Sequence, residues 1–131
     1  VAHQSLLINF SNGATGTFSM NGGAADSNRH IHITGTRGEI SGSFNTQRFT
    51  ISHIAPKMPQ GRLIQTVDVT DLQKGNAHGG GDQAIVKDFI AMVKGEKVSI
   101  CHTTLEDSMI GHRLIFLAEK SRERGGKLQY Y

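Results

Sequence analysis

The sequence has one cysteine, Cys101, two prolines and no tryptophan among its 131 residues. A single cysteine excludes a disulfide within the chain and is typical of a reducing compartment, so we expect a cytoplasmic location. The sequence has no apolar run approaching the roughly 20 residues that span a bilayer and no visible signal peptide, which predicts no membrane partner. Basic residues are scattered and the net charge is only +3. We therefore expect no nucleic acid partner.

Glycine is frequent, with 16 residues, while hydrophobic residues make up 37% and charged residues 19% of the chain. This composition is typical of a folded, turn-rich globular protein. The length suits one domain, so we expect residues 1–131 to form a single domain. Because the chain starts at Val1 and reaches a strand pattern almost at once, we interpret it as a fragment of a longer protein.

The first half of the sequence alternates between apolar and polar residues with the period of β-strands. Leu6, Ile8 and Phe10 lead into Asn12-Gly13, a dipeptide that favours a hairpin turn with two positive φ angles. Further strands are indicated at residues 14–20, 29–34, 39–44, 49–53 and 62–69, with a last short strand at 127–131. The connections are short, which predicts antiparallel neighbours.

After these strands the apolar residues take helical spacing. A glycine-rich loop over residues 72–81 leads to a helix with Asp82 as its N-cap and Gly95 just beyond its end. Thr103 and Glu106 form a capping-box pattern for a second helix. Strands followed by helices predict an α+β fold, a largely antiparallel sheet of about six strands with two helices packed on one face.

Several stretches together carry a family resemblance. They are INFSNGATGTFSM at residues 8–20, IHITGTRGEI at 31–40, and HGGGDQAIVKDF at 78–89 followed by TTLEDSMIGHRLIFLAEKSR at 103–122. In their order and spacing, from about residue 3 to the end, the chain resembles the C-terminal domain of the glucose–fructose oxidoreductase, inositol dehydrogenase and MocA (Gfo/Idh/MocA) family.

The resemblance implies an NAD(P)-dependent oxidoreductase. Family members bind NAD or NADP in an N-terminal Rossmann domain, and a sugar, cyclitol or related hydroxyl-bearing substrate lies between the two domains and exchanges hydride with the nicotinamide. This chain lacks a Gly-x-Gly-x-x-Gly turn after a strand, so we expect no cofactor-binding residue in it and no activity of the chain alone. The Lys-Pro dipeptide, Asp and His that serve catalysis in the family would lie upstream of Val1, which leaves the catalytic residues unknown.

Two helices can cover only one face of a six-stranded sheet. We expect the open face to form a homodimer or a larger homo-oligomer, as it often does in the family. Leu7 would line this contact together with either Ile31 and Ile33 or His30 and His32, because alternation puts the two pairs on opposite faces. The sequence leaves open which face is used.

The residues His78-Gly79-Gly80-Gly81-Asp82 form the candidate substrate-binding site. Glycines allow another group to approach the backbone, and a helix N-terminus favours acceptors and anions. His78 and Asp82 would supply the donors and acceptors that a hydroxyl-rich substrate needs. The alternative is that Asp82 only caps the helix and His78 is an ordinary loop residue, and the sequence leaves both interpretations open.

Three further features have simpler interpretations. His30 and His32 lie two residues apart on one strand face, but a third metal ligand at a suitable spacing is missing, so we expect no metal site. His112 falls on an apolar helical stripe, which predicts a hydrogen-bonded core histidine. Cys101 precedes a helix cap, and we expect a lone buried thiol.

Two other functions stay open from the sequence. One is a stand-alone binding or dimerisation module that uses the sheet and performs no chemistry. The other keeps the family but uses the nucleotide for transient oxidation during glycoside cleavage. The sequence identifies neither the substrate nor the choice between NAD and NADP.

Overall fold

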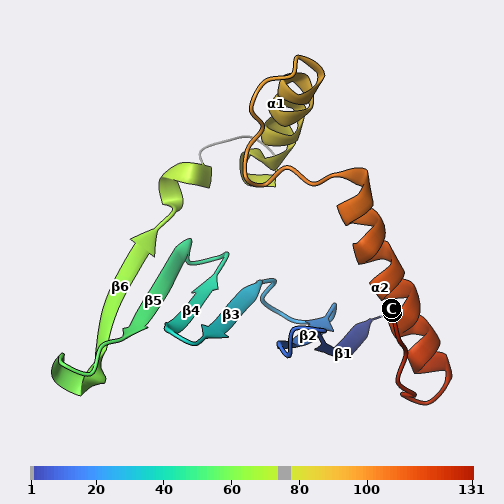
Figure 1. Ribbon diagram of the computed structural model, residues 1–131, viewed down its shortest axis with the longest axis horizontal. Coiled ribbons are helices and arrows are strands. Elements are labelled where there is room, and N and C mark those ends of the chain that lie inside the picture. Colours follow the sequence, from blue (N-terminus) through green and yellow to red (C-terminus); the bar gives the residue numbers. More distant parts are fainter. Residues whose placement is uncertain (1, 74–77) are drawn as a thin grey trace. The chain divides into compact units, whose positions relative to one another are not determined.

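The computed structural model describes residues 2–73 and 78–131 of the chain (Figure 1). Contacts between Cα atoms divide the chain into two compact units. One comprises Val1–Ala24 with Gly95–Tyr131, and the other comprises Ala25–Lys94. The single domain expected from the length stays a prediction.

The first unit contains a hairpin, formed by β1 (His3–Asn9) and β2 (Thr15–Asn21), whose two strands pair in antiparallel register. The backbone N–H of Gly13 donates to the carbonyl of Phe10 at 3.0 Å, and Gly13 has a φ of 86°. The predicted hairpin is therefore confirmed. The expected pair of positive φ angles is wrong, because in this turn Gly13 alone has one, as in a type I turn followed by a left-handed glycine.

The first unit also contains the long helix α2 (Leu105–Glu123). Its N-cap is Thr104, whose hydroxyl accepts from the backbone N–H of Asp107 at 3.1 Å, while the Asp107 carboxylate accepts from the Thr104 N–H at 3.3 Å. The predicted capping box at Thr103 and Glu106 is therefore wrong by one residue. Two adjacent threonines followed by two adjacent acids make both registers possible in sequence, and Asp serves at the third helical position here instead of Glu.

The strand expected at residues 127–131 does not form. The side-chain amide of Gln129 donates to the carbonyls of Lys127 and Leu128 at 3.0 and 2.9 Å. Tyr131 lies against the guanidinium of Arg113, with 4.4 Å from Cζ to the ring centroid. Local side-chain contacts thus take the place of a ladder of backbone hydrogen bonds.

The second unit contains a four-stranded antiparallel sheet in the order β3-β4-β5-β6. Its strands are β3 (His30–Gly35), β4 (Gly38–Ser43), β5 (Arg48–Ile54) and β6 (Arg62–Asp68). The short 3-10 helix η1 (Pro59–Gly61) joins β5 to β6. Two more, η2 (Thr70–Gln73) and η3 (His78–Gly80), precede helix α1 (Gly81–Val93).

The strand register separates the side chains of this sheet into two chemically different faces, because paired residues share a face and successive residues alternate. The apolar face carries Ile31, Ile33, Ile40, Phe49, Ile51, Leu63 and Val67, with His53 and Gln65 as its polar members. The hydroxyl-rich face carries Thr34, Ser41, Thr50, Ser52 and Thr66, with His30, His32, Glu39, Arg48 and Asp68, and also the two isoleucines Ile54 and Ile64. The structure thus assigns Ile31 and Ile33 to the apolar face and His30 and His32 to the other.

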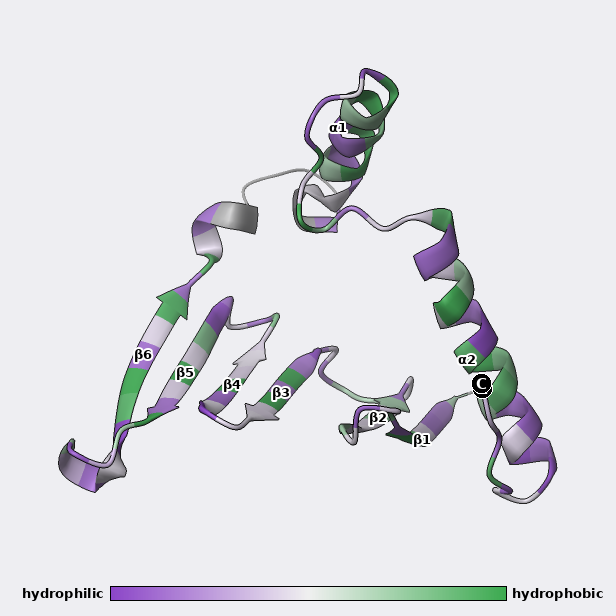
Figure 2. Cartoon of the chain, in the orientation of Figure 1, coloured by the Kyte–Doolittle hydropathy of each residue, from purple (hydrophilic) through white to green (hydrophobic). Residues whose placement is uncertain are grey.

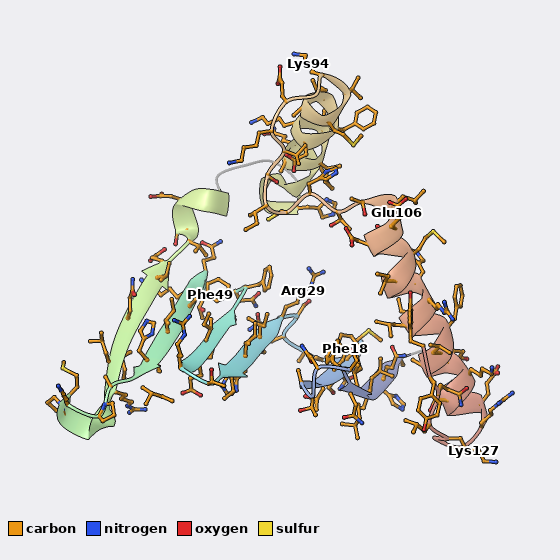
Figure 3. The ribbon with its side chains drawn as sticks, in the orientation of Figure 1. Phe18, Arg29, Phe49, Lys94, Glu106 and Lys127 are labelled. Atoms are coloured by element: carbon orange, nitrogen blue, oxygen red, sulfur yellow. The ribbon has the colours of Figure 1, made fainter. Side chains whose placement is uncertain are left out.

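No hydrophobic side chain among the described residues is buried, and the one buried residue is Ser43, 8% exposed. Apolar and polar segments alternate along the strands and helices in Figure 2. Two aromatic residues labelled in Figure 3 illustrate this: Phe18 on β2 is exposed and Phe49 on β5 is half-buried. Apolar surface of this extent normally has a partner.

The fold class is α+β, as predicted: the described residues form two α-helices, three short 3-10 helices and six strands, and these strands pair only in antiparallel fashion. The six strands form two sheets, of two and four strands, rather than one. The packing of both helices on one sheet face stays a prediction. No helix in the described part of the chain is long and apolar enough to cross a membrane.

Candidate functional site

The backbone just before α1 takes an unusual path. His78 has a φ of 60°, a left-handed conformation that residues with a side chain seldom adopt, and Gly80 has a φ of 85°. Gly80 is the N-cap of α1 and contributes no side chain to the cap. The conformation explains why glycine is needed at Gly80, where the sequence suggested only close approach of another group.

His78 and Asp82 lie in direct contact across this turn. Nδ1 of His78 is 3.0 Å from Oδ2 and 3.2 Å from Oδ1 of Asp82. Both side chains are open to solvent, 80% exposed for His78 and 62% for Asp82. The two predicted substrate-binding residues are therefore brought together, four residues apart at the start of the helix.

Asp82 is not the N-cap of α1, which corrects the sequence-based expectation. It lies in the first turn, after Gly80 and Gly81, and its carboxylate meets the imidazole of His78. A carboxylate in the first turn still favours the helix through the dipole. The capping pattern was misassigned because a left-handed glycine can begin a helix without a side-chain cap. The end of the helix agrees with prediction, since Gly95 follows the C-cap Lys94 with a φ of 71°.

His30 and His32 have separate partners on the hydroxyl-rich face. Nε2 of His32 is 3.0 Å from Oε2 of Glu39, and Nε2 of His30 is 3.1 Å from Nδ2 of Asn28. Across the described residues, three or more His, Cys, Asp or Glu side chains do not gather in a group that could hold a metal ion. These histidines act as local hydrogen-bonding groups.

Two other predictions about single residues need correction. His112 is hydrogen-bonded, with Nδ1 2.9 Å from the carbonyl oxygen of Ser108, but it is exposed rather than in a core. Cys101 is an exposed free thiol, not a buried one. Both corrections follow from the lack of buried hydrophobic side chains among the residues that the structure describes.

Asn28, which the sequence did not single out, organises the loop before β3. Its Oδ1 accepts from the backbone N–H groups of Arg29 and Asn45, at 2.8 and 3.2 Å, and from the hydroxyl of Ser43 at 3.0 Å. The only sequence signal was an asparagine placed just before a strand. These contacts tie the loop before β3 to Ser43 at the end of β4 and to the turn between β4 and β5.

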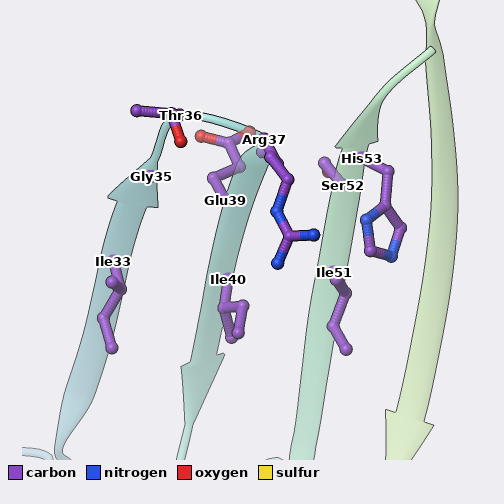
Figure 4. Close-up of a pocket in the computed structure, with 10 residues that line it drawn as sticks. Ile33, Gly35, Thr36, Arg37, Glu39, Ile40, Ile51, Ser52 and His53 are labelled. Atoms are coloured by element: carbon purple, nitrogen blue, oxygen red, sulfur yellow. The ribbon is translucent and has the colours of Figure 1, made fainter.

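A shallow hollow of about 470 Å³ lies at the end of the sheet where β3 turns into β4. Its apolar wall comes from Ile33, Ile40 and Ile51, and the side chain of Arg37 extends from the turn toward them in Figure 4. Gly38 closes the turn with a φ of 149°, and a Cβ there would lie 2.1 Å from the carbonyl oxygen of Ser52. The hollow includes neither His78 nor Asp82, so it does not coincide with the predicted site.

Comparison of the chain with family models, with curated proteins and with solved structures gives no match. Membership of the Gfo/Idh/MocA family therefore stays a prediction that rests on the motifs of the sequence.

Proposed function

We propose that this chain is the substrate-side domain of an NAD(P)-dependent oxidoreductase of the Gfo/Idh/MocA type, acting on a sugar, a cyclitol or a related hydroxyl-bearing substrate. The observation that carries the proposal is the contact between His78 and Asp82 at the start of α1. The succession of antiparallel strands and then helices agrees with the resemblance in the sequence.

The chemistry of this contact suits a hydroxyl. A hydroxyl group both donates and accepts a hydrogen bond. The exposed imidazole of His78 offers an acceptor for the hydroxyl proton. The backbone N–H groups in the first turn of α1 offer donors to the hydroxyl oxygen, since the first N–H groups of a helix have no partner within it. His78 and the first turn of α1 therefore present an acceptor and donors close together.

The residues of this chain do not fit a dinucleotide. A Rossmann site needs a strand that runs straight into a glycine turn and a helix, with a parallel neighbour. Throughout the described ranges every strand pair is antiparallel, and the short helix η2 follows the last strand before the glycines. We therefore assign the nucleotide to another domain and derive no step of this chain through it.

The proposal is tested by kinetics in the protein that carries this chain together with a dinucleotide-binding domain. Reduction of NAD or NADP is followed with a panel of sugars and cyclitols. We expect His78→Ala to lower kcat/KM by about tenfold or more, with little change in Tm. This is roughly the effect of losing one to two hydrogen bonds to the substrate in the transition state.

The matched control is His32→Ala. His32 is also an exposed histidine bonded to a carboxylate, with side-chain exposures of 60% for His32 and 44% for Glu39. It should leave kcat/KM nearly unchanged. Equal effects of the two variants, or unchanged kinetics in His78→Ala, would contradict the proposed role.

A second candidate function is a binding or dimerisation module without chemistry. The exposed apolar face of the four-stranded sheet favours it, since a surface of this kind normally meets a partner. A self-associating chain whose complete protein shows no turnover with any hydroxyl-bearing substrate would support the module over the enzyme.

A further inference from the structure

The carboxylate of Asp82 faces the imidazole ring of His78. Both of its oxygens lie within 3.2 Å of Nδ1 of the ring. The N-cap role that an acid at this place in the sequence usually takes belongs to Gly80, which forms no side-chain bond. The geometry therefore leaves Asp82 with a partner four residues earlier in the chain.

This contact determines where the histidine carries its proton. An ionised carboxylate only accepts hydrogen bonds, so Nδ1 must donate. A neutral imidazole has a single N–H, and its other nitrogen is then an acceptor. In His78 the acceptor is Nε2, on a side chain that is 80% exposed.

We propose that Asp82 is a positioning residue that holds His78 in the Nδ1–H tautomer and presents Nε2 as a hydrogen-bond acceptor. This role rests on the proposed function, in which His78 meets a substrate hydroxyl. The O–H of that hydroxyl then donates to Nε2, and Asp82 acts through the ring without touching the substrate. The sequence predicts that His78 and Asp82 bind substrate, with Asp82 either accepting from a hydroxyl or orienting the loop; the role proposed here is instead a relay of two hydrogen bonds, from the hydroxyl to His78 and from His78 to Asp82.

Other histidines of the chain supply internal references. Nδ1 of His112 donates to the carbonyl oxygen of Ser108 at 2.9 Å, which fixes the same tautomer without a carboxylate. Nε2 of His32 is 3.0 Å from Oε2 of Glu39 and must donate to it, which fixes the opposite tautomer. One spectrum of the chain therefore contains both patterns.

The experiment is two-dimensional ¹H–¹⁵N correlation of the imidazole rings of the whole chain, at an alkaline pH at which the spectrum shows the rings in their neutral form. We expect the Nδ1–H pattern for His78 and His112 and the Nε2–H pattern for His32. Asp82→Ala should move His78 alone toward the Nε2–H form that an unrestrained histidine favours in water, and Asp82→Glu should restore the original pattern in part.

The matched control is Glu106→Gln, which removes a carboxylate from the first turn of the other helix and should change none of the three patterns. An Nε2–H pattern for His78 in the unaltered chain, or an unchanged His78 in Asp82→Ala, would overturn the proposal. The spectra need neither substrate nor nucleotide. A kinetically silent His78→Ala would thus reject the proposed function on its own, while the tautomer result decides the positioning by Asp82.

Discussion

The ring of Phe49 on β5 lies directly over Gly42 on β4. The two residues are paired in the register of the sheet, and a Cβ built on Gly42 would be 2.3 Å from Cδ1 of Phe49 and 2.7 Å from Cε1. The missing side chain of Gly42 thus gives the aromatic ring its place on the apolar face. Packing of an aromatic ring over a cross-strand glycine is a recognised way to stabilise a sheet position that glycine would otherwise weaken.

Gly42→Ala should therefore destabilise the four-stranded sheet. The ring must leave its position, and overpacking of this kind costs about 1–3 kcal/mol. The free energy of unfolding is measured by denaturant titration, with hydrogen exchange of the β4 and β5 amides as a local probe. Gly35→Ala is the control, because the nearest atom to its Cβ, the carbonyl oxygen of Gly38, is 3.7 Å away. Phe49→Leu should recover part of the loss in a double variant.

Asp68 at the end of β6 has a depressed pKa. The hydroxyl and the backbone N–H of Thr70 donate to Oδ1 at 2.5 and 2.9 Å, and Nε of Arg48 donates to Oδ2 at 3.2 Å. These contacts, the Thr70 hydroxyl first, lower the pKa of Asp68 from its ordinary value of 3.8 to about 2. Thr70 of η2 and Arg48 of β5 thus stabilise the ionised carboxylate of Asp68 relative to the protonated form.

The expected consequence is a loss of stability in acid. A carboxyl with a lowered pKa in the folded chain stabilises it fully above the unfolded pKa, and the contribution is lost as the pH falls from about 4 to about 2. Because the group is exposed, the effect is small. The free energy of unfolding of Asp68→Asn should be below that of the parent at neutral pH and converge with it near pH 2. Parallel curves for Asp68→Asn and the parent would contradict the assignment.

The sequence predicted the strands better than the residues at which the helices begin. Alternation placed residues such as Ile31 and Ile33 on one face, and the pairing confirms it because a half-apolar strand has only one register that keeps its faces apart. The capping residues were harder to predict, since neighbouring Thr and acidic residues allow two registers of the capping box, and only the backbone geometry decides between them.

The candidate site could be predicted in its members but not in its geometry. His78 and Asp82 stood out by residue type at a helix start, and a spacing of four suggests contact within a helix. Their contact here forms across a turn in which His78 has a positive φ, a conformation that residue preferences do not predict. Asn28 was missed because its three acceptor contacts join it to a neighbouring residue and to residues at least 15 positions away.

The chain alone should bind neither NAD nor NADP with micromolar affinity. Its glycines before α1 are not preceded directly by a strand, so the pyrophosphate would lack the tight strand-to-helix turn that holds it. Titration calorimetry with both nucleotides checks this. A dissociation constant below about 10 μM for either one would place a nucleotide site in this chain and contradict the assignment to another domain.

The chain should also self-associate through one face of the four-stranded sheet. At micromolar concentration, sedimentation should show a species larger than the 14.2 kDa chain. Gln65 and Thr66 are neighbouring exposed residues of the edge strand β6, and they lie on opposite faces of the sheet, Gln65 with Ile51 and Thr66 with Thr50. Lysine at an edge-strand position is well tolerated by a sheet, but desolvating its charge in a contact is costly. One of Gln65→Lys and Thr66→Lys should therefore lower the association and the other should leave it unchanged, which identifies the face. A monomeric parent chain, or two variants that associate as the parent does, would show that the sheet faces do not form the contact.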